Sequence, residues 1–174
     1  RAREIDPLSP YVAAMNLWPL NEGRRYDETL VEAEKLLRLS PDLFLARLVL
    51  AQALFHRGER ERAVREFETV AKQTPDVPTI NAWLGWAYGR TGRRRDAERM
   101  LADLAAAPPE RFVQPYARAL VLVGLDRKDE ALTWLETGVH NHTEEVIFLK
   151  VEPAMDPLRG EPRFATLLRQ LGFA

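Results

Sequence analysis

Few side chains in this sequence are placed to make or break bonds. His140 and His142, on either side of Asn141, come nearest to a metal-binding pattern. Two histidines at this spacing with no third ligand nearby are a weak metal signal, and a helix C-terminus explains a cationic histidine well, because the helix dipole favours positive charge there. We find no glycine-rich phosphate loop, nucleophile motif or carboxylate pair. We therefore expect no catalytic residue, no metal site and no cofactor.

Arginines are concentrated at one point in the chain. The cluster comprises Arg90, Arg93, Arg94, Arg95 and Arg99. A basic edge of this kind could bind an acidic partner or a phosphate backbone. Acidic residues are interleaved with it, however, both here and at the equivalent turns, as with Asp96 and Asp129. That mixture favours a solvated edge crossed by salt bridges over a binding surface.

The overall composition limits the possible partners. The chain has 174 residues, of which 46% are hydrophobic and 29% charged, with a net charge of −1 and no cysteine. An apolar fraction of this size can support a core, and the balanced charge argues against nucleic acid as a partner of the whole chain. No apolar run approaches the roughly 18 residues of a membrane span, so we expect no membrane insertion within this chain. The lack of cysteine excludes disulfides and leaves the redox compartment open.

Prolines and small residues recur at a fixed interval. Both series step by 34 residues: Pro7, Pro41, Pro75 and Pro109, and Thr29, Ala63, Ala97 and Ala131. A period of about 20–50 residues indicates stacked supersecondary units, and 34 residues is the period of a two-helix repeat. The turn inside each unit holds Gly23, Gly58, Gly92 and Asp126. Glycine ends a helix and permits a tight turn because it tolerates positive φ.

The same period predicts where the helices lie. In each unit the small residue lets the second helix approach the first closely, and the proline ends that second helix. Pro19 disrupts the first predicted helix. The predicted pairs are 11–22 with 27–39, 43–57 with 60–73, 78–90 with 94–106, and 112–124 with 128–140.

The third unit resembles the tetratricopeptide repeat. It carries Asn81, Leu84-Gly85, Tyr88, Ala97, Leu101 and Pro109 at the family's spacing, although Asn81 stands where the family has an aromatic residue. The first unit is degenerate in its first helix, and the fourth has Thr143 at the proline position. The resemblance implies an all-α, right-handed superhelix (an α-solenoid) of four repeats that bind proteins. The repeats would span residues 10–43, 44–77, 78–111 and 112–143.

The two ends of the chain differ from the repeats. We interpret residues 144–174 as a C-terminal cap, whose last amphipathic helix would cover the open end of the array. This tail is similar to the ends of repeat arrays in bacterial multidomain regulators. Residues 1–8 look like the end of an upstream helix, which favours a fragment of a longer protein over a short N-terminal extension.

The resemblance also implies where a partner would bind. In this family the first helices line a concave groove, and the inherited positions are rich in aromatic residues. They include Tyr11, Trp18, Phe55, Trp83, Trp86 and Tyr116. Aromatic side chains suit a peptide or helix ligand, but the same residues could be core between helices. The basic and amide side chains that grip a peptide carboxylate in some members are missing.

Three functions remain open at this stage. The first is a scaffold or sensor module of a larger, bacterial regulatory protein that docks a helix or peptide in this groove. The second is a module that drives homodimerisation. The third is a sensor of small ligands or glycans, in which Trp18, Trp83 and Trp86 would stack on the ligand.

Overall fold

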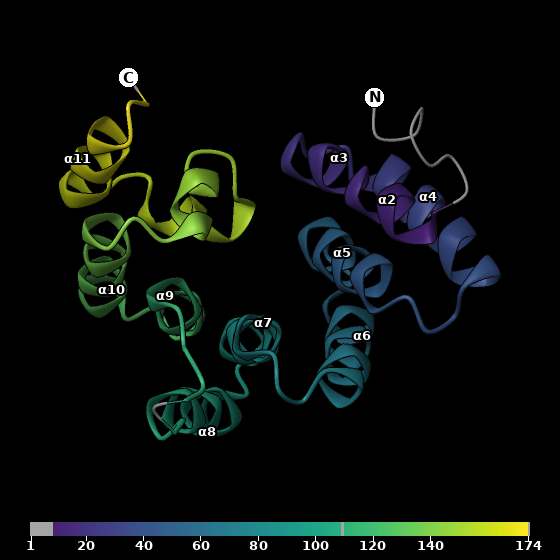
Figure 1. Cartoon of the computed structure of the whole chain (residues 1–174), viewed down its shortest axis with the longest axis horizontal. Helices are drawn as coiled ribbons and strands as arrows, with labels where there is room; N and C mark the ends of the chain where they lie inside the picture. The colour runs from purple at the N-terminus through teal and green to yellow at the C-terminus, as the bar shows by residue number, and fades with distance from the viewer. Residues whose placement is uncertain (1–8, 109, 174) are drawn as a thin grey trace. The chain divides into compact units, whose positions relative to one another are not determined.

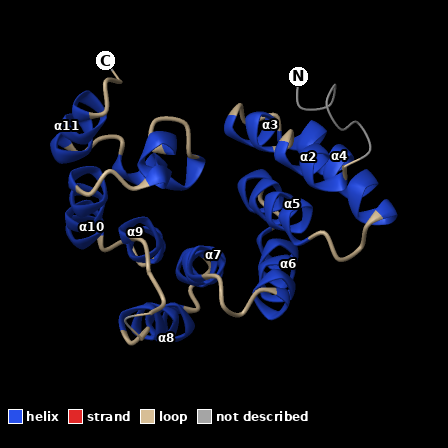
Figure 2. Ribbon diagram, in the orientation of Figure 1, coloured by secondary structure: helices blue, strands red, loops and turns tan. Residues whose placement is uncertain are grey.

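The computed structural model describes residues 9–108 and 110–173, and every regular element among them is a helix (Figure 1). Figure 2 shows these helices joined by turns and loops. The predicted upstream tail, residues 1–8, and Pro109 lie outside the described residues. The chain forms two compact units, residues 1–74 and 75–174.

The N-terminal unit is built from two helix pairs, and the first helix of the first pair is split into α2 and α3. Helix α5 is buried around most of its circumference, because it packs against both α4 and α6. Helix α6 has one apolar stripe, formed by Ala63, Val64, Phe67 and Val70. The elements are α2 (Pro10–Met15), α3 (Trp18–Glu22), α4 (Tyr26–Leu39), α5 (Phe44–Arg57) and α6 (Arg60–Gln73).

The C-terminal unit continues the pairing and ends in a capping segment. Its elements are α7 (Pro78–Arg90), α8 (Arg94–Ala105), α9 (Pro115–Gly124), α10 (Lys128–His140), the 3₁₀ helices η1 (Glu144–Phe148) and η2 (Pro153–Leu158), and α11 (Pro162–Gln170). Helix α7 packs against α8 and α9, and α9 packs against α10 and η2. Helix α11 packs against α10, and its residues Phe164 and Leu167 are buried. The prediction of an all-α fold with helices packed in sequential pairs is confirmed.

Small residues lie where the two helices of a pair meet, as the repeat pattern predicts. The four residues at this position have no exposed surface: Thr29, Ala63, Ala97 and Ala131, each 0% exposed. Thr29 also satisfies its buried hydroxyl, which donates to the carbonyl of Arg25 at 2.9 Å. A larger side chain at these positions would have no room without moving a helix.

The turn inside each repeat adopts the same backbone conformation. The residue with positive φ is Arg24, Gly58, Gly92 or Asp126. The next residue donates its backbone N–H to a carbonyl in the last turn of the preceding helix, at 2.9 Å in all four cases: Arg25 to Leu20, Glu59 to Leu54, Arg93 to Tyr88 and Arg127 to Leu122. This pattern is the Schellman helix end.

The structure corrects one glycine assignment in this series. Gly23 has φ −75°, and Arg24 takes the left-handed conformation with φ 59°. Arg24 is the residue in register with Gly58, so the presence of a neighbouring glycine was misleading. A Cβ added to Gly23 would lie 2.9 Å from the carbonyl oxygen of Pro19, so this glycine permits close approach of the backbone.

Prolines explain the other two differences from the predicted helices. The single helix predicted for 11–22 is two short helices, because Pro19 is accommodated only in the first turn of a new helix. The helix predicted for 112–124 begins at Pro115. Gln114 is extended (φ −64°, ψ 141°), as expected for a residue that precedes proline.

Candidate protein-interaction site

The structure divides the six predicted groove aromatics into two groups. Phe55, Trp83, Trp86 and Tyr116 are buried, and Trp86 is only 2% exposed. Tyr11 on α2 is 53% exposed, and Trp18 on α3 is partly exposed. Most of the predicted aromatic surface is therefore not available on the outside of the molecule.

Close approach of two helix backbones explains this burial in the C-terminal unit. A Cβ added to Gly89 would lie 2.5 Å from the carbonyl carbon of Gly124, and one added to Gly124 would lie 2.6 Å from the Cα of Trp86. Helices α7 and α9 thus touch through their main chains, without side chains between them. The Trp86 ring packs edge to face on Trp83, with ring centroids 5.4 Å apart.

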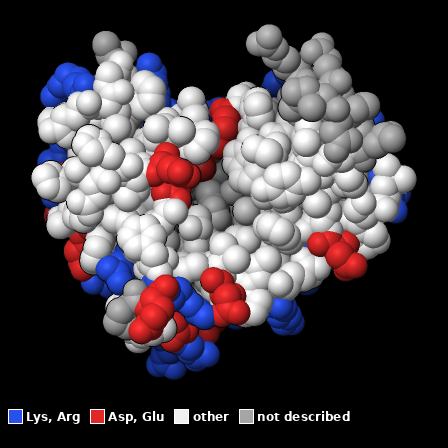
Figure 3. Space-filling model, viewed as in Figure 1, with Lys and Arg blue, Asp and Glu red and all other residues white. Residues whose placement is uncertain are grey.

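The predicted basic edge is largely occupied by salt bridges. Arg93 Nε donates to Asp96 at 2.8 Å, and its guanidinium lies 3.9 Å from the centre of the Tyr88 ring. Arg94 pairs with Glu98 at 3.0 Å, and Arg99 lies 4.0 Å from Asp96. Arg90 and Arg95 are exposed. Figure 3 shows basic and acidic side chains interleaved around α8, as the sequence predicts for a solvated edge.

The residue that precedes the second helix of each repeat pairs with a residue in that helix's first turn. These ion pairs are Arg25–Glu28, Glu59–Arg62, Arg93–Asp96 and Arg127–Glu130. In the second repeat the order of the charges is reversed, because the acid Glu59 precedes the helix and Arg62 lies in its first turn. The hydrogen bond from Arg127 lowers the pKa of Glu130, and Arg25 acts in the same way on Glu28. These charges therefore have a structural role at the start of each helix.

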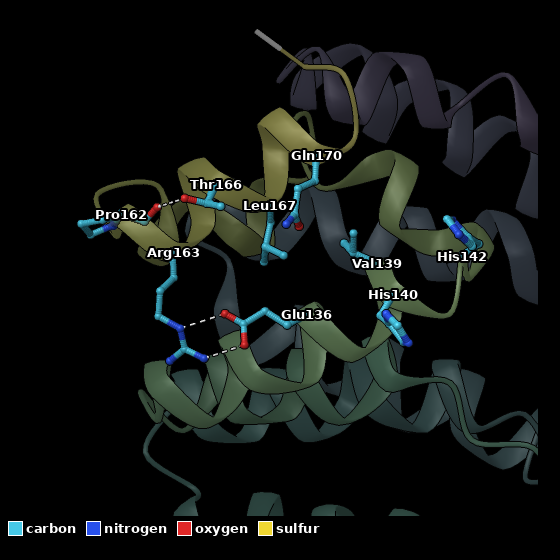
Figure 4. Close-up of a pocket in the computed structure, with 9 residues that line it drawn as sticks. All are labelled: Glu136, Val139, His140, His142, Pro162, Arg163, Thr166, Leu167 and Gln170. Atoms are coloured by element: carbon cyan, nitrogen blue, oxygen red, sulfur yellow. Dashed lines mark hydrogen bonds and ion pairs between the residues drawn. The ribbon is translucent and has the colours of Figure 1, made fainter.

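A shallow pocket lies between α10 and α11, and His140 and His142 are at its edge (Figure 4). Its volume is about 550 Å³. Arg163 closes one side by donating to both carboxylate oxygens of Glu136, at 2.9 and 2.8 Å, and this bonding lowers the pKa of Glu136. Within residues 9–108 and 110–173, no three histidine, cysteine, aspartate or glutamate side chains are grouped to hold a metal ion.

Sequence reasoning missed the exposed apolar residues of the cap. The sequence predicts residues 144–174 only as a cap that ends in an amphipathic helix. Val146 and Leu149 are indeed buried, but Ile147, Phe148 and Val151 are 56%, 46% and 44% exposed. The missing signal was the helix period, because a 3₁₀ helix has about three residues per turn and therefore buries a different set of side chains from an α-helix.

Comparison with known proteins identifies the family. Tetratricopeptide repeat profiles match residues 20–81 and, in a second match, residues 82–103 with 116–137. The chain belongs to the tetratricopeptide repeat family. Such repeats are generally protein–protein interaction modules and typically act as non-catalytic scaffolds.

One relative is a bacterial protein of greater length. The chain is 28% identical over 127 residues to TPR repeat-containing protein PA4667 of Pseudomonas aeruginosa. The match covers 72% of this chain and 21% of that protein. No solved structure matches the chain significantly. None of the helices in the described part of the chain has the length and apolar character that crossing a membrane requires.

Proposed function

We propose that this chain is a protein-binding module of a larger bacterial regulatory protein, in which it serves as a scaffold or sensor. Three observations support the proposal: the repeats belong to a family of interaction modules, the relative is bacterial, and the chain spans about a fifth of that relative's length (21%).

Within the N-terminal unit, we place the binding surface on the first helices of the array. Tyr11 and Met15, both 53% exposed on α2, carry this proposal, and Trp18 follows on α3. These residues keep part of their apolar surface in water, so a helix or peptide could remove it from solvent. Tyrosine and tryptophan are common binding hot spots because they bury a large area with few rotatable bonds.

The buried aromatics support the proposal less well. Trp83 and Trp86 are 4% and 2% exposed, so a partner could contact little of either ring. The same burial counts against a glycan or small-ligand sensor that stacks on them, because only Trp18 of the three tryptophans in that hypothesis keeps an accessible face.

Affinity capture from the source organism would test the proposed surface. The purified chain would serve as bait, with Tyr11→Ala/Trp18→Ala as the test variant and Val31→Ala as the control, since Val31 is 51% exposed on α4 of the same unit. We expect the double variant to lose the captured partner while its circular dichroism stays native. Equal capture by the wild type and the double variant would contradict the proposed surface.

Self-association is tested by sedimentation over a concentration series. A wild-type dimer that becomes a monomer in the Tyr11→Ala/Trp18→Ala variant would show that this surface binds a second copy of the chain.

A further inference from the structure

The cap segment from Glu144 to Glu152 exposes its residues with a period of three. One row is buried: Val146 is 3% exposed, Leu149 0% and Glu152 4%. Within η1 (Glu144–Phe148) this spacing follows from 3₁₀ geometry, in which residues i and i+3 lie above one another, and the turn after η1 keeps the same spacing to Glu152. In the other two rows every residue is exposed except Glu145, which is half-buried. Glu144 stands in line with Ile147, and Glu145 with Phe148 and Val151. Each exposed apolar residue therefore shares a row with an acid.

The two acids in these rows are not neutralised by neighbours. Among the residues that the structure describes, neither Glu144 nor Glu145 has an ion-pair partner. Most other acids of the C-terminal unit do, including Asp129 and Glu136 with Arg163, Asp156 with Arg159, and Glu161 with Lys128. The nearest lysine in the sequence, Lys150, lies over the Phe173 ring at 5.6 Å.

Glu145 also has an unsatisfied carboxylate oxygen. Its Oε2 is shielded from solvent and accepts no hydrogen bond from the described residues. Burial, with a further contribution from Glu144, raises the pKa of Glu145 above its ordinary value. A cationic group placed near this half-buried carboxylate would favour its charged form.

The segment is held in shape before any partner arrives. Arg159 donates to the carbonyl oxygen of Lys150 at 2.8 Å and to Asp156 at 2.6 Å. Glu152 accepts from the backbone N–H of Ala154 at 3.0 Å. A surface that is already ordered loses little conformational entropy on binding. Figure 3 shows acidic atoms next to uncharged surface over the segment that links α10 to α11 in Figure 1.

We propose that the rows formed by Glu144, Glu145, Ile147, Phe148 and Val151 are a docking surface for a basic amphipathic segment of a partner protein. The partner's lysine or arginine side chains would pair with the two glutamates, and its apolar face would cover Ile147, Phe148 and Val151. This surface is formed by other residues than the one proposed on α2 and α3, so either proposal can fail without the other.

The probe for this surface is a short peptide of leucine and lysine arranged as an amphipathic helix, with fluorescence anisotropy as the readout. We expect it to bind in the micromolar range and to bind less tightly at high salt, because the contact is partly ionic. A matched peptide with glutamate in place of lysine should not bind. If neither peptide binds, or both bind equally well, the proposal is overturned.

Substitutions locate the peptide on the chain. Ile147→Ser/Phe148→Ser and Glu144→Gln/Glu145→Gln should each weaken binding by about tenfold or more. The controls are Phe112→Ser, which changes a residue that is 69% exposed in the same unit, and Asp103→Asn, which removes an exposed acid from α8. Both controls should bind as the wild type does. An equal loss in the controls would show non-specific adsorption, and an unchanged affinity in the test variants would place the peptide elsewhere; either result contradicts the proposal.

Discussion

Helices α7 and α9 and the cap segment 144–151 are all rich in apolar residues, yet they differ in what they expose. In α7 and α9 the apolar side chains are almost all buried, because the two backbones touch at Gly89 and Gly124. In the cap segment one row in three is buried, and the apolar residues of the other two rows, Ile147, Phe148 and Val151, are exposed. The difference shows that apolar content does not identify a binding surface; the helix period and the closeness of the neighbouring helix decide what stays exposed.

The largest change in stability should come from removing the Trp86 side chain. Because Trp86 is 2% exposed, Trp86→Ala should lower the free energy of unfolding by about 3–5 kcal/mol. Chemical denaturation followed by circular dichroism measures this change. Phe148→Ala is the matched variant in the cap and should stay within about 0.5 kcal/mol of the wild type. Similar losses in the two variants would remove the distinction between the two regions.

The contact between backbones can be tested by adding a single methyl group. Gly124→Ala should destabilise the chain by about 1–3 kcal/mol or more, because the new Cβ would lie 2.6 Å from the main chain of Trp86. Gly160→Ala is the control, since a Cβ there meets nothing within 4 Å. A Gly124→Ala protein that melts at the wild-type temperature would mean that α7 and α9 are farther apart than described.

The turns inside the repeats should give smaller effects of opposite sign. Gly58→Ala forces a side chain into a backbone with φ 102° and should cost about 1 kcal/mol. Asp126 has φ 60°, and Asp126→Gly removes the steric strain that a side chain causes in this conformation. This substitution should raise the melting temperature slightly. Differential scanning calorimetry resolves both changes. If the two substitutions shift the melting temperature in the same direction, the turns are not equivalent.

The smallest effects concern two carboxylates, Glu136 at the pocket and Glu145 in the cap segment. Bonding to Arg163 lowers the pKa of Glu136, so its stabilising effect is present above the ordinary glutamate pKa and is lost as the pH falls through the lowered value. Glu136→Gln should therefore reduce the melting temperature near neutral pH and have no effect in acid.

Glu145 should behave in the opposite way. Burial raises its pKa, so its stabilising effect is present below the ordinary glutamate pKa and is lost as the pH rises through the raised value. Glu145→Gln should leave the melting temperature unchanged or slightly higher near neutral pH. Melting curves over a pH series compare the two variants, and a clear loss of stability in Glu145→Gln at neutral pH would show that this carboxylate has a partner.

The fold could be predicted well from the sequence because the repeat period reflects the geometry of one helix pair. The buried series from Thr29 to Ala131 and the helices 60–73, 78–90 and 128–140 follow from small residues and prolines at fixed positions. The turn residue of the first repeat was assigned wrongly, because the glycine at position 23 was preferred to Arg24, which the repeat register places in line with Gly58.

The candidate surface was less predictable from the sequence. The groove positions were taken from the family pattern, which does not predict that the backbones of α7 and α9 touch at Gly89 and Gly124. This close contact buries Trp83 and Trp86. The exposed rows of the cap depend on a 3₁₀ helix, whose period a short apolar run such as 146–151 does not reveal.

Amide hydrogen exchange, measured with and without the leucine–lysine peptide, tests the central contrast most directly. In the free chain, the buried amides of α7 and α9 should exchange slowly and those of residues 144–151 faster. The peptide should slow exchange in residues 144–151 and leave α7 and α9 unchanged. Slower exchange in α7 and α9, with no change in residues 144–151, would contradict the account and return the binding surface to the buried aromatics.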